Sequence, residues 1–343
     1  MKKKILIVLL LILGIGTYFG YGFYTKIKKS NTIKKGFIYI KTNATFEDLK
    51  TALSPFLKDK KSFEWVANKK KFTKPKAGKY AIKKGLSNNS LVNMLRIGKQ
   101  VPVKVAFNNQ HSLEKFAGRI ASQIEADSIP LLNAFTDKDF LKKSKFTKAQ
   151  VLGMFIPNSY QFKWNTSAEK FRDKMLVEYH KFWNKSRLAK AKKLNLNPIQ
   201  VTALASIVHK ETAKPSERPI VAGLYLNRLR DKWPLEADPT IIYAMNKKYD
   251  KDLEIRRVLF KYIEETKKSP YNTYKNQGLP PSLIAMPDIS AIDAVLNAKN
   301  HSYFFMCASV SKIGYHEFAK TLAQHNRNRT KYINKKNKQG IRN

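Results

Sequence analysis

The chain contains one cysteine, Cys307, in 343 residues. A single cysteine cannot build a disulfide framework, so an exported chain of this kind must hold its domains together by packing alone. Cys307 lies in an apolar run at 303–307 that predicts a buried strand rather than a reactive thiol. Acidic residues are also scarce, because 25 Asp and Glu stand against 66 Lys and Arg and give a formal net charge of +41.

The basic residues are mostly lysines and are scattered through every segment rather than gathered in one stripe. The sequence has no Arg-rich arm, zinc-ligand spacing or RNP-type aromatic motif, which argues against a nucleic acid partner. The charge instead indicates a compositional bias with a secondary benefit near anionic surfaces. The sequence predicts no metal and no cofactor, because no pair of histidines has metal-ligand spacing beside a carboxylate and no glycine-rich loop can cradle a phosphate.

Charge is absent from residues 5–24, a run long enough to cross a bilayer. Aromatic residues crowd its far end, where an interfacial belt would lie. A cleaved signal peptide is the alternative, but the run is longer than a usual signal core and no A-x-A-like site follows it. Lysines flank the run on both sides, so the charge distribution does not fix its orientation. The sequence favours an uncleaved signal anchor.

Glu211 stands where the pattern predicts the buried face of a helix. Val201, Leu204 and Val208 recur at helical spacing, and Glu211 continues the same face. Pro215 stops the helix, so Glu211 occupies its last turn. Apolar neighbours and the negative end of the helix dipole both disfavour the ionised carboxylate and raise its pKa. A carboxylic acid that stays protonated near neutral pH suits a general acid, whereas the alternative is a carboxylate frayed into solvent.

Glu211 is also part of an ordered set of short motifs. These are Ala-Ser-Ile-Val at 205–208, Lys-Glu-Thr at 210–212, Ser-Glu-Arg at 216–218, Asn-Arg-Leu at 227–229, Asp-Pro-Thr at 238–240, Tyr-Asn-Thr-Tyr at 271–274, Gly-Leu-Pro-Pro at 278–281 and Gly-x-His-x-Phe at 314–318. The set resembles the endolytic murein transglycosylases of the YceG-like family. That family usually has Glu where this chain has His209, so the resemblance assigns the catalytic acid to the second Glu of the motif, Glu211.

The resemblance implies an α+β fold with an N-terminal transmembrane helix, a small LysM-like mixed subdomain and a helix-rich, lysozyme-like transglycosylase region. We expect a cytoplasmic tip, anchor and basic linker at 1–35, the LysM-like subdomain at 36–108, a helical connecting region at 109–196, the catalytic domain at 197–330 and a basic tail at 331–343. A LysM-like unit implies contact with an N-acetylglucosamine polymer, and a packed spacer is the alternative.

Local patterns predict the elements of these regions. In the LysM-like subdomain the sequence predicts strands at 37–41 and 101–107, a turn into another strand over 76–82, a helix capped by Thr45 and a helix at 87–97. Helices are expected at 113–126, 129–135 and 167–185 in the connecting region. In the catalytic domain Ser216 is expected to cap a helix that begins near 219, and Asp238 to cap the next one.

Several further residues are candidates for substrate binding or support. A short loop of aromatic and polar side chains suits sugar recognition, and the candidates are Tyr271, Asn272, Thr273 and Tyr274, joined by Asn227 and Asp238. The expected supporting residues are Glu217, Arg218 and His316. Glu217 is expected to pair with Arg218 or Arg228, and His316 either to orient the acid or to serve as a structural partner.

The implied function is that of a membrane-anchored endolytic transglycosylase that cleaves the MurNAc-GlcNAc bond of nascent peptidoglycan strands. It would leave 1,6-anhydro-MurNAc ends and terminate glycan elongation. One alternative is a hydrolytic muramidase that pairs Glu211 with Glu217 or Asp238, since ordinary glycosidases need two carboxylates. The other is a non-catalytic glycan-binding scaffold.

The expected partners are glycan strands, the membrane through the N-terminal helix and the cell-wall synthesis machinery. The expected location is the bacterial cytoplasmic (inner) membrane, crossed once, with the catalytic part on the periplasmic, extracytoplasmic side.

Overall fold

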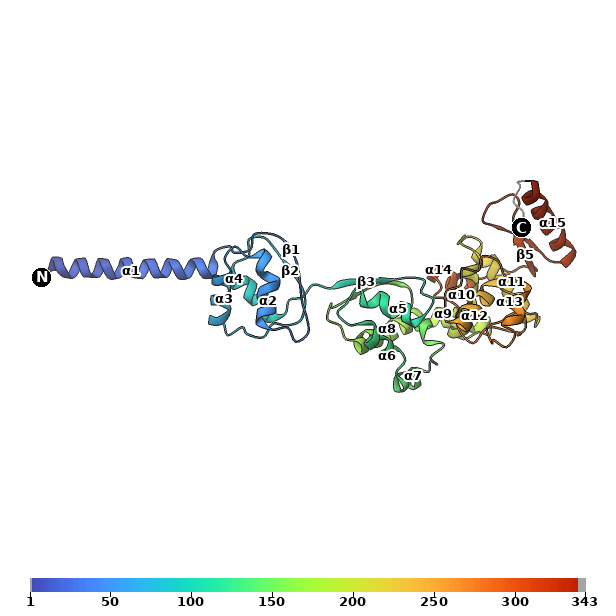
Figure 1. Ribbon diagram of the computed structural model, residues 1–343, viewed down its shortest axis with the longest axis horizontal. Helices are drawn as coiled ribbons and strands as arrows, with labels where there is room; N and C mark the ends of the chain where they lie inside the picture. The colour runs from blue at the N-terminus through green and yellow to red at the C-terminus, as the bar shows by residue number, and fades with distance from the viewer. Residues whose placement is uncertain (1, 339–343) are drawn as a thin grey trace. The chain divides into compact units, whose positions relative to one another are not determined.

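The computed structural model describes residues 2–338, which form helices and small two-stranded sheets (Figure 1). Residue 1 of the expected cytoplasmic tip and residues 339–343 of the expected basic tail lie outside the described residues. The chain divides into two compact units. The first contains the residues up to Val105 with Ile120–Asp127 and Tyr160–Ser167, and the second contains Ala106–Arg119, Ser128–Ser159 and the chain from Ala168 onward. The helix-rich α+β fold class is confirmed.

The first unit is built around a two-stranded antiparallel sheet covered by helices. Its elements are α1 (Lys2–Lys28), β1 (Gly36–Ile40), α2 (Phe46–Leu53), a 3-10 turn (Ser54–Phe56), α3 (Lys60–Lys69), β2 (Gly78–Ile82) and α4 (Asn88–Ile97). β1 pairs with β2 so that Ile38 lies opposite Tyr80, and both side chains are buried in the core of the unit. The predicted strands and helices are confirmed, including the capping box in which Thr45 and Asp48 exchange hydrogen bonds. Helix α3 was not predicted from the sequence.

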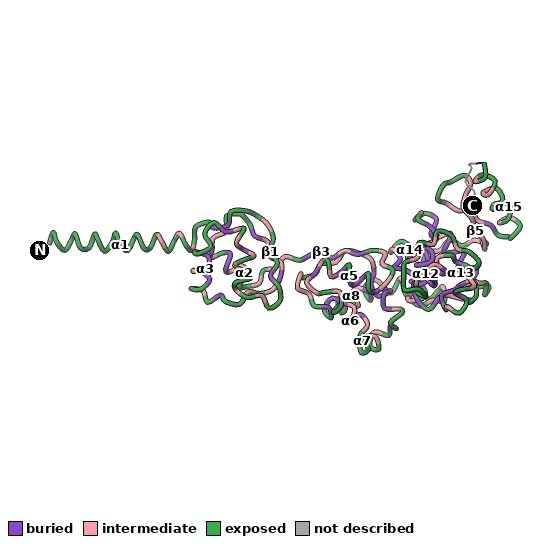
Figure 2. Tube along the Cα trace, in the orientation of Figure 1, coloured by how far each residue is buried: buried purple, intermediate pink, exposed green. Residues whose placement is uncertain are grey.

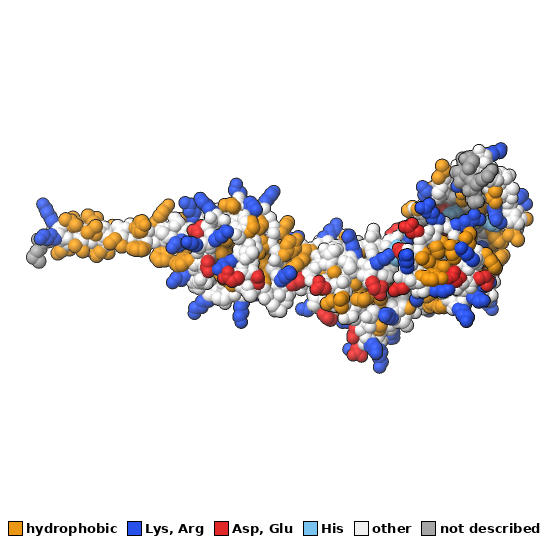
Figure 3. All heavy atoms as spheres, viewed as in Figure 1, with side chains coloured by type: hydrophobic (Ala, Val, Ile, Leu, Met, Phe, Trp, Pro, Cys, Tyr) orange, Lys and Arg blue, Asp and Glu red, His pale blue; other side chains and the backbone are white. Residues whose placement is uncertain are grey.

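The N-terminal helix α1 is exposed along nearly its whole length and apolar in its middle (Figures 2 and 3). Among residues 2–338 it is the one helix whose length and composition would allow it to cross a membrane, and a signal sequence has the same properties. The last turns of α1 contact the rest of the first unit. Phe23 packs against Trp65 of α3 at 5.5 Å between ring centroids, and the Asn88 amide donates to the carbonyl of Lys26 at 2.9 Å.

The second unit is mainly helical. Its first elements are α5 (Leu113–Ala121), α6 (Ser128–Phe135), α7 (Lys138–Ser144), a 3-10 turn (Val151–Met154), α8 (Ala168–Phe182) and α9 (Lys185–Lys193). The remaining ones are α10 (Pro198–Glu211), α11 (Arg218–Arg230), α12 (Asp238–Tyr249), α13 (Phe260–Glu265), α14 (Ile289–Leu296), β5 (Phe305–Ala308), β6 (His316–Ala319) and α15 (Leu322–Lys338). The strands β3 (Val103–Phe107) and β4 (Asn158–Phe162) each contain residues of both units. The sequence missed α7 and α9, and α5 ends before the predicted residue 126.

Helix α10 lies at the centre of the second unit and contacts α11, α12 and α14. The sequence predicted one buried face, but every residue from 201 to 208 is buried. Small residues such as Ala203 and Ser206 let neighbouring helices approach from all sides. The Ser206 hydroxyl donates to the carbonyl of Ala203 and accepts a hydrogen bond from the backbone of Ile284. α10 is therefore a rigid support for the residues at its two ends.

Two predicted helix caps are wrong. Glu217 rather than Ser216 precedes α11, and the Ser216 hydroxyl instead lies 3.4 Å from the hydroxyl of Tyr315. α12 begins at Asp238 itself, with Ala237 in the capping position, so the Asp238 carboxylate does not cap the helix. Because the Ser216 hydroxyl and the Asp238 carboxylate do not cap a helix, both groups remain available for other contacts.

Cys307 lies in a strand as predicted, but its predicted full burial is wrong. β5 pairs with β6 in a two-stranded sheet, where Cys307 lies opposite Glu317, and the thiol is half-buried. A two-stranded sheet covers little of its own surface, which explains the exposure. Partial burial still raises the pKa of the Cys307 thiol, so it stays protonated and unreactive near neutral pH.

Candidate active site

Glu211 is the last residue of α10 and its side chain is half-buried. Tyr225 of α11 donates its hydroxyl hydrogen to Glu211 Oε1 at 2.8 Å. Burial raises the pKa of Glu211 to about 7, although the hydrogen bond from Tyr225 lowers it, and the negative charge of Asp238 adds to the rise. The raised pKa expected from the sequence is confirmed. Glu211 can therefore hold a proton near neutral pH and release it without a large free-energy cost.

Tyr225 is a functional candidate that the sequence analysis missed. The ring is 2% exposed, and burial raises the pKa of the phenol well above its ordinary value, so the hydroxyl remains a donor. Because the Tyr225 hydrogen bond occupies Glu211 Oε1, the acidic proton is directed to Oε2. The one available signal was the position of Tyr225 four residues after Val221, on the buried face of the helix that follows Glu211.

Asp238 is an exposed carboxylate at the start of α12 and accepts a hydrogen bond from the Tyr274 hydroxyl at 2.5 Å. Burial and the nearby Asp238 carboxylate raise the pKa of the Tyr274 phenol. Thr273 fixes the beginning of α12, because its hydroxyl oxygen accepts from the backbone of Ala237 at 3.1 Å and lies 2.8 Å from the hydroxyl of Thr240. The loop at 271–274 therefore positions Asp238 near Glu211.

The loop at 271–274, expected to bind sugar, has three buried residues. Tyr271, Asn272 and Thr273 are at most 2% exposed, and only Tyr274 is partly accessible. The Asn272 amide donates to the carbonyl of Ile263 at 2.9 Å and to the Thr266 hydroxyl, and its oxygen accepts from the backbone of Tyr274 and Lys275. The loop is thus a buried structural element that presents Tyr274 and Asp238.

Asn227 is buried as well. Its amide donates to the carbonyls of His301 at 2.8 Å and Tyr303 at 3.1 Å, and its oxygen accepts from Arg230. All of its hydrogen-bonding groups are engaged within the fold. The structure places Asn227 as a link between α11 and the segment that precedes β5.

The buried Glu217 pairs with the half-buried His316. Glu217 Oε1 accepts from the backbone N–H of His316 at 2.7 Å, and Glu217 Oε2 lies 2.9 Å from His316 Nδ1. The expected pairing of Glu217 with Arg218 or Arg228 is wrong. The positive charge that His316 carries when protonated lowers the pKa of Glu211. Both oxygens of the Glu217 carboxylate are occupied, which leaves it poorly placed to activate a water molecule.

Arg218 belongs to a separate cluster with His209 and Asp288. Its guanidinium donates to His209 Nδ1 at 3.2 Å, to the Ser290 hydroxyl at 2.5 Å and to Asp288 Oδ2 at 3.4 Å. His209 Nε2 contacts the Asn109 amide at 2.8 Å, and burial lowers the pKa of His209. His209 therefore stays neutral near pH 7 and has both ring nitrogens engaged. Among residues 2–338 no group of three or more His, Cys, Asp or Glu side chains could hold a metal ion.

These contacts define a candidate acid-base site formed by Glu211, Tyr225, Asp238 and Tyr274 beside the Glu217–His316 pair. The chain belongs to the YceG-like family, whose model matches residues 38–331.

The chain is 28% identical to the endolytic murein transglycosylase of Bacillus subtilis over 82% of this chain and 79% of that protein. It is 26% identical to the endolytic murein transglycosylase of Streptococcus pneumoniae D39, over 96% of this chain and 65% of that protein. The chain thus spans just under two thirds of the pneumococcal relative.

A crystal structure of a YceG-like protein from Listeria monocytogenes has the same fold. It superposes with a TM-score of 0.57 at 26% identity and covers 86% of this chain and 98% of the Listeria chain.

The buried role of Asn272 predicts the effect of removing its amide. Asn272→Ala leaves the backbone N–H of Tyr274 without its partner and removes the amide hydrogen bond to the carbonyl of Ile263, so we expect a loss on the order of 1–3 kcal/mol in the free energy of unfolding. Gln277→Ala, at an exposed position three residues after the loop, is the control and should change stability by less than about 0.5 kcal/mol. Denaturant unfolding measures both. Equal stability of the two variants would show that Asn272 is not structural.

Proposed function

We propose that this chain is a membrane-anchored endolytic lytic transglycosylase that cleaves the MurNAc-GlcNAc bond of peptidoglycan and forms 1,6-anhydro-MurNAc ends. The observation that carries the proposal is the half-buried Glu211 carboxyl group with its pKa near 7. The names of the Bacillus and pneumococcal relatives support peptidoglycan as the substrate. Cleavage within nascent strands would terminate their elongation.

In the first step, protonated Glu211 gives its proton to the glycosidic oxygen as the bond to the MurNAc anomeric carbon breaks. The Tyr225 hydroxyl holds Glu211 Oε1, so Oε2 carries the transferred proton. Loss of the proton creates a carboxylate, and the Tyr225 hydrogen bond stabilises that charge. The Asp238 carboxylate is a second negative group near the developing positive charge of the sugar ring, and Tyr274 fixes its orientation.

In the second step, the Glu211 carboxylate accepts the proton of the 6-hydroxyl group of the same MurNAc residue. The hydroxyl oxygen bonds to the anomeric carbon and closes the 1,6-anhydro ring. Glu211 ends the cycle protonated, and water is not consumed. A pKa near 7 suits both halves of this exchange, because the group must donate and then accept a proton at the same pH.

A hydrolytic muramidase is the second candidate, and the position of Asp238 favours it. Asp238 is exposed, lies close enough to raise the pKa of Glu211, and is not used in a helix cap. It could activate water as the second carboxylate of an ordinary glycosidase. Glu217 is a weaker partner for such a mechanism, because His316 occupies both of its oxygens.

Replacement of the acid tests the proposal. Glu211→Gln should lower turnover of purified sacculi at least about 100-fold, because an amide cannot donate and reclaim the proton. His209→Ala should lose less than about 10-fold, since His209 contacts Arg218 and Asn109 rather than Glu211. Circular dichroism confirms the fold of each variant, and mass spectrometry identifies the products.

Anhydro-MurNAc ends that disappear in Glu211→Gln support the transglycosylase. Reducing ends that incorporate labelled water, and that vanish in Asp238→Asn, would assign the chain to the muramidase class. Activity above about a tenth of the wild-type value in Glu211→Gln would require another acid.

We also propose that α1 is an uncleaved single-pass anchor in the cytoplasmic membrane, with both compact units outside the cytoplasm. The charge-free run at 5–24 and its terminal aromatic residues support an anchor, and a peptidoglycan substrate supports the orientation. This location would bring the site close to membrane-bound wall synthesis. A LysM-like first unit could then contact the glycan strand.

The anchor has a direct test. The intact chain should remain in the membrane fraction after an alkaline wash, because the apolar span contributes far more to membrane binding than surface charge does. Mass spectrometry of the N-terminus checks whether the span is still present. Soluble chains that begin near residues 20–25 would identify α1 as a cleaved signal sequence.

A further inference from the structure

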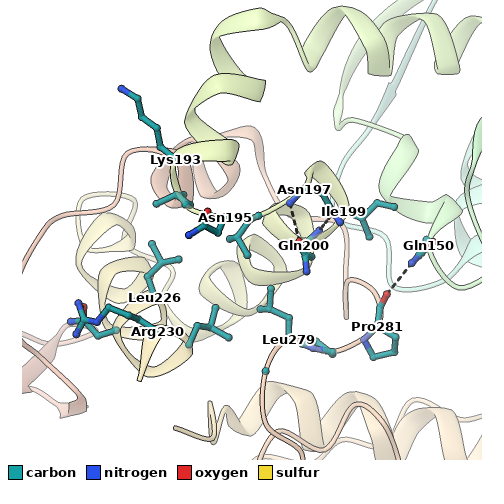
Figure 4. Close-up of a pocket in the computed structure, with 16 residues that line it drawn as sticks. Gln150, Lys193, Asn195, Asn197, Ile199, Gln200, Leu226, Arg230, Leu279 and Pro281 are labelled. Atoms are coloured by element: carbon teal, nitrogen blue, oxygen red, sulfur yellow. Dashed lines mark hydrogen bonds between the residues drawn. The ribbon is translucent and has the colours of Figure 1, made fainter. Parts of the chain in front are cut away.

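A cavity of about 850 Å³ (Figure 4) borders the first turn of α10, whereas Glu211 is the last residue of this helix. Its walls come from the first turn of α10, the last turns of α11 and the Gly-Leu-Pro-Pro segment at 278–281. α10 has 14 residues, and a rise of 1.5 Å per residue places the two ends about 20 Å apart. The cavity is therefore distinct from the acid-base site and belongs to the same compact unit.

The cavity combines apolar and cationic walls. Four aliphatic side chains give it apolar surface, and they are Ile199, Leu226, Leu229 and Leu279. Lys193 and Arg230 lie on the left in Figure 4, whereas Gln150 and Pro281 lie on the right. No Asp or Glu is among the lining residues that the structure describes. Asn195 and Gln200 add side-chain amides, so the walls offer apolar contact, hydrogen bonds and positive charge together.

The positive charge is available to a ligand. Within residues 2–338, Lys193 has no carboxylate partner. Arg230 pairs with Asp231 at 2.7 Å, but both side chains are exposed. Such an ion pair contributes little to the stability of the fold, so Arg230 can exchange Asp231 for a carboxylate of a ligand. The N-terminus of α10 also borders the cavity and adds the positive end of a helix dipole. The cavity thus favours an anionic occupant with apolar parts.

We propose that this cavity binds the peptide stem carried by a peptidoglycan saccharide remote from the bond that Glu211 cleaves. The proposal rests on the proposed function of the chain. A stem peptide has carboxylates for Lys193 and Arg230, methyl groups for the apolar walls and backbone amides for Gln200 and Asn195. Bare N-acetylglucosamine units have no charge, and their one aliphatic group is the methyl of the acetyl substituent.

The cavity and the acid-base site share their supporting segments. Leu226 follows Tyr225 directly on α11, and Leu279 follows Tyr274 in the same segment of chain. A bound stem would hold the glycan strand at a fixed distance of about one helix length from Glu211. The binding energy of the stem would then favour peptide-bearing strands and select the bond that is cleaved.

The test uses the full-length chain in detergent with two substrates, namely uncrosslinked peptide-bearing strands and the same strands after enzymatic removal of their peptides. We expect Lys193→Glu/Arg230→Glu to lower kcat/KM at least about 10-fold on peptide-bearing strands and less than twofold on stripped strands. Lys185→Glu/Lys192→Glu makes the same change in net charge at exposed positions of α9 outside the cavity. This control should leave the preference of the wild-type chain unchanged.

Calorimetric titration with the free pentapeptide stem measures binding without catalysis. Glu211→Gln should bind the peptide like the wild-type chain, and Lys193→Gln/Arg230→Gln, a milder change, should bind it at least about 10-fold more weakly. Equal turnover of both substrates by the wild-type chain, equal losses on both in the cavity variant, or unchanged peptide binding would overturn the proposal. A wild-type chain that cleaves neither substrate but binds the peptide would reject the proposed function and leave the cavity assignment intact.

Discussion

The burial of the Glu211 carboxyl group is the interaction on which the rest of the site depends. α11, α12 and α14 pack around α10, and its residues 201–208 are buried. Glu211 is the last residue of this helix and lies at the edge of the core, where its side chain is partly shielded from solvent. Removing a carboxylate from water disfavours its charged form, and this cost raises the pKa of Glu211 to about 7. The packing of one helix therefore sets the chemistry of the group at its end.

The polar side chains around this carboxyl group form hydrogen bonds in pairs. Tyr225 donates a hydrogen bond to Glu211, Tyr274 donates one to Asp238, and the His316 ring is hydrogen-bonded to the Glu217 carboxylate. Buried polar groups without partners would destabilise the fold, so each of these residues stabilises the structure as well as the site. A motif that suggests ligand binding can therefore consist largely of residues that position a few exposed atoms.

The sequence predicted the fold class, most elements of the first unit and the raised pKa of Glu211, because these depend on local periodicity, capping and helix position. The sequence predictions failed for residues whose role depends on the direction of the side chain in the folded protein. Asn272 and Asn227 have the chemistry of sugar ligands, but tertiary packing turns them inward. Tyr225 was missed because its contact with Glu211 joins two helices and leaves no local pattern. The partner of Glu217 is likewise 99 residues away in the chain.

The pH dependence of kcat/KM tests most directly whether this environment controls the acid. For the wild-type chain, kcat/KM should fall as pH rises through about 7, because the reaction needs protonated Glu211. Tyr225→Phe removes a bond that lowers the pKa of Glu211 and should move the fall to higher pH. Asp238→Asn removes a charge that raises this pKa and should move the fall to lower pH. The same midpoint in all three proteins, or shifts in the reverse directions, would contradict the account.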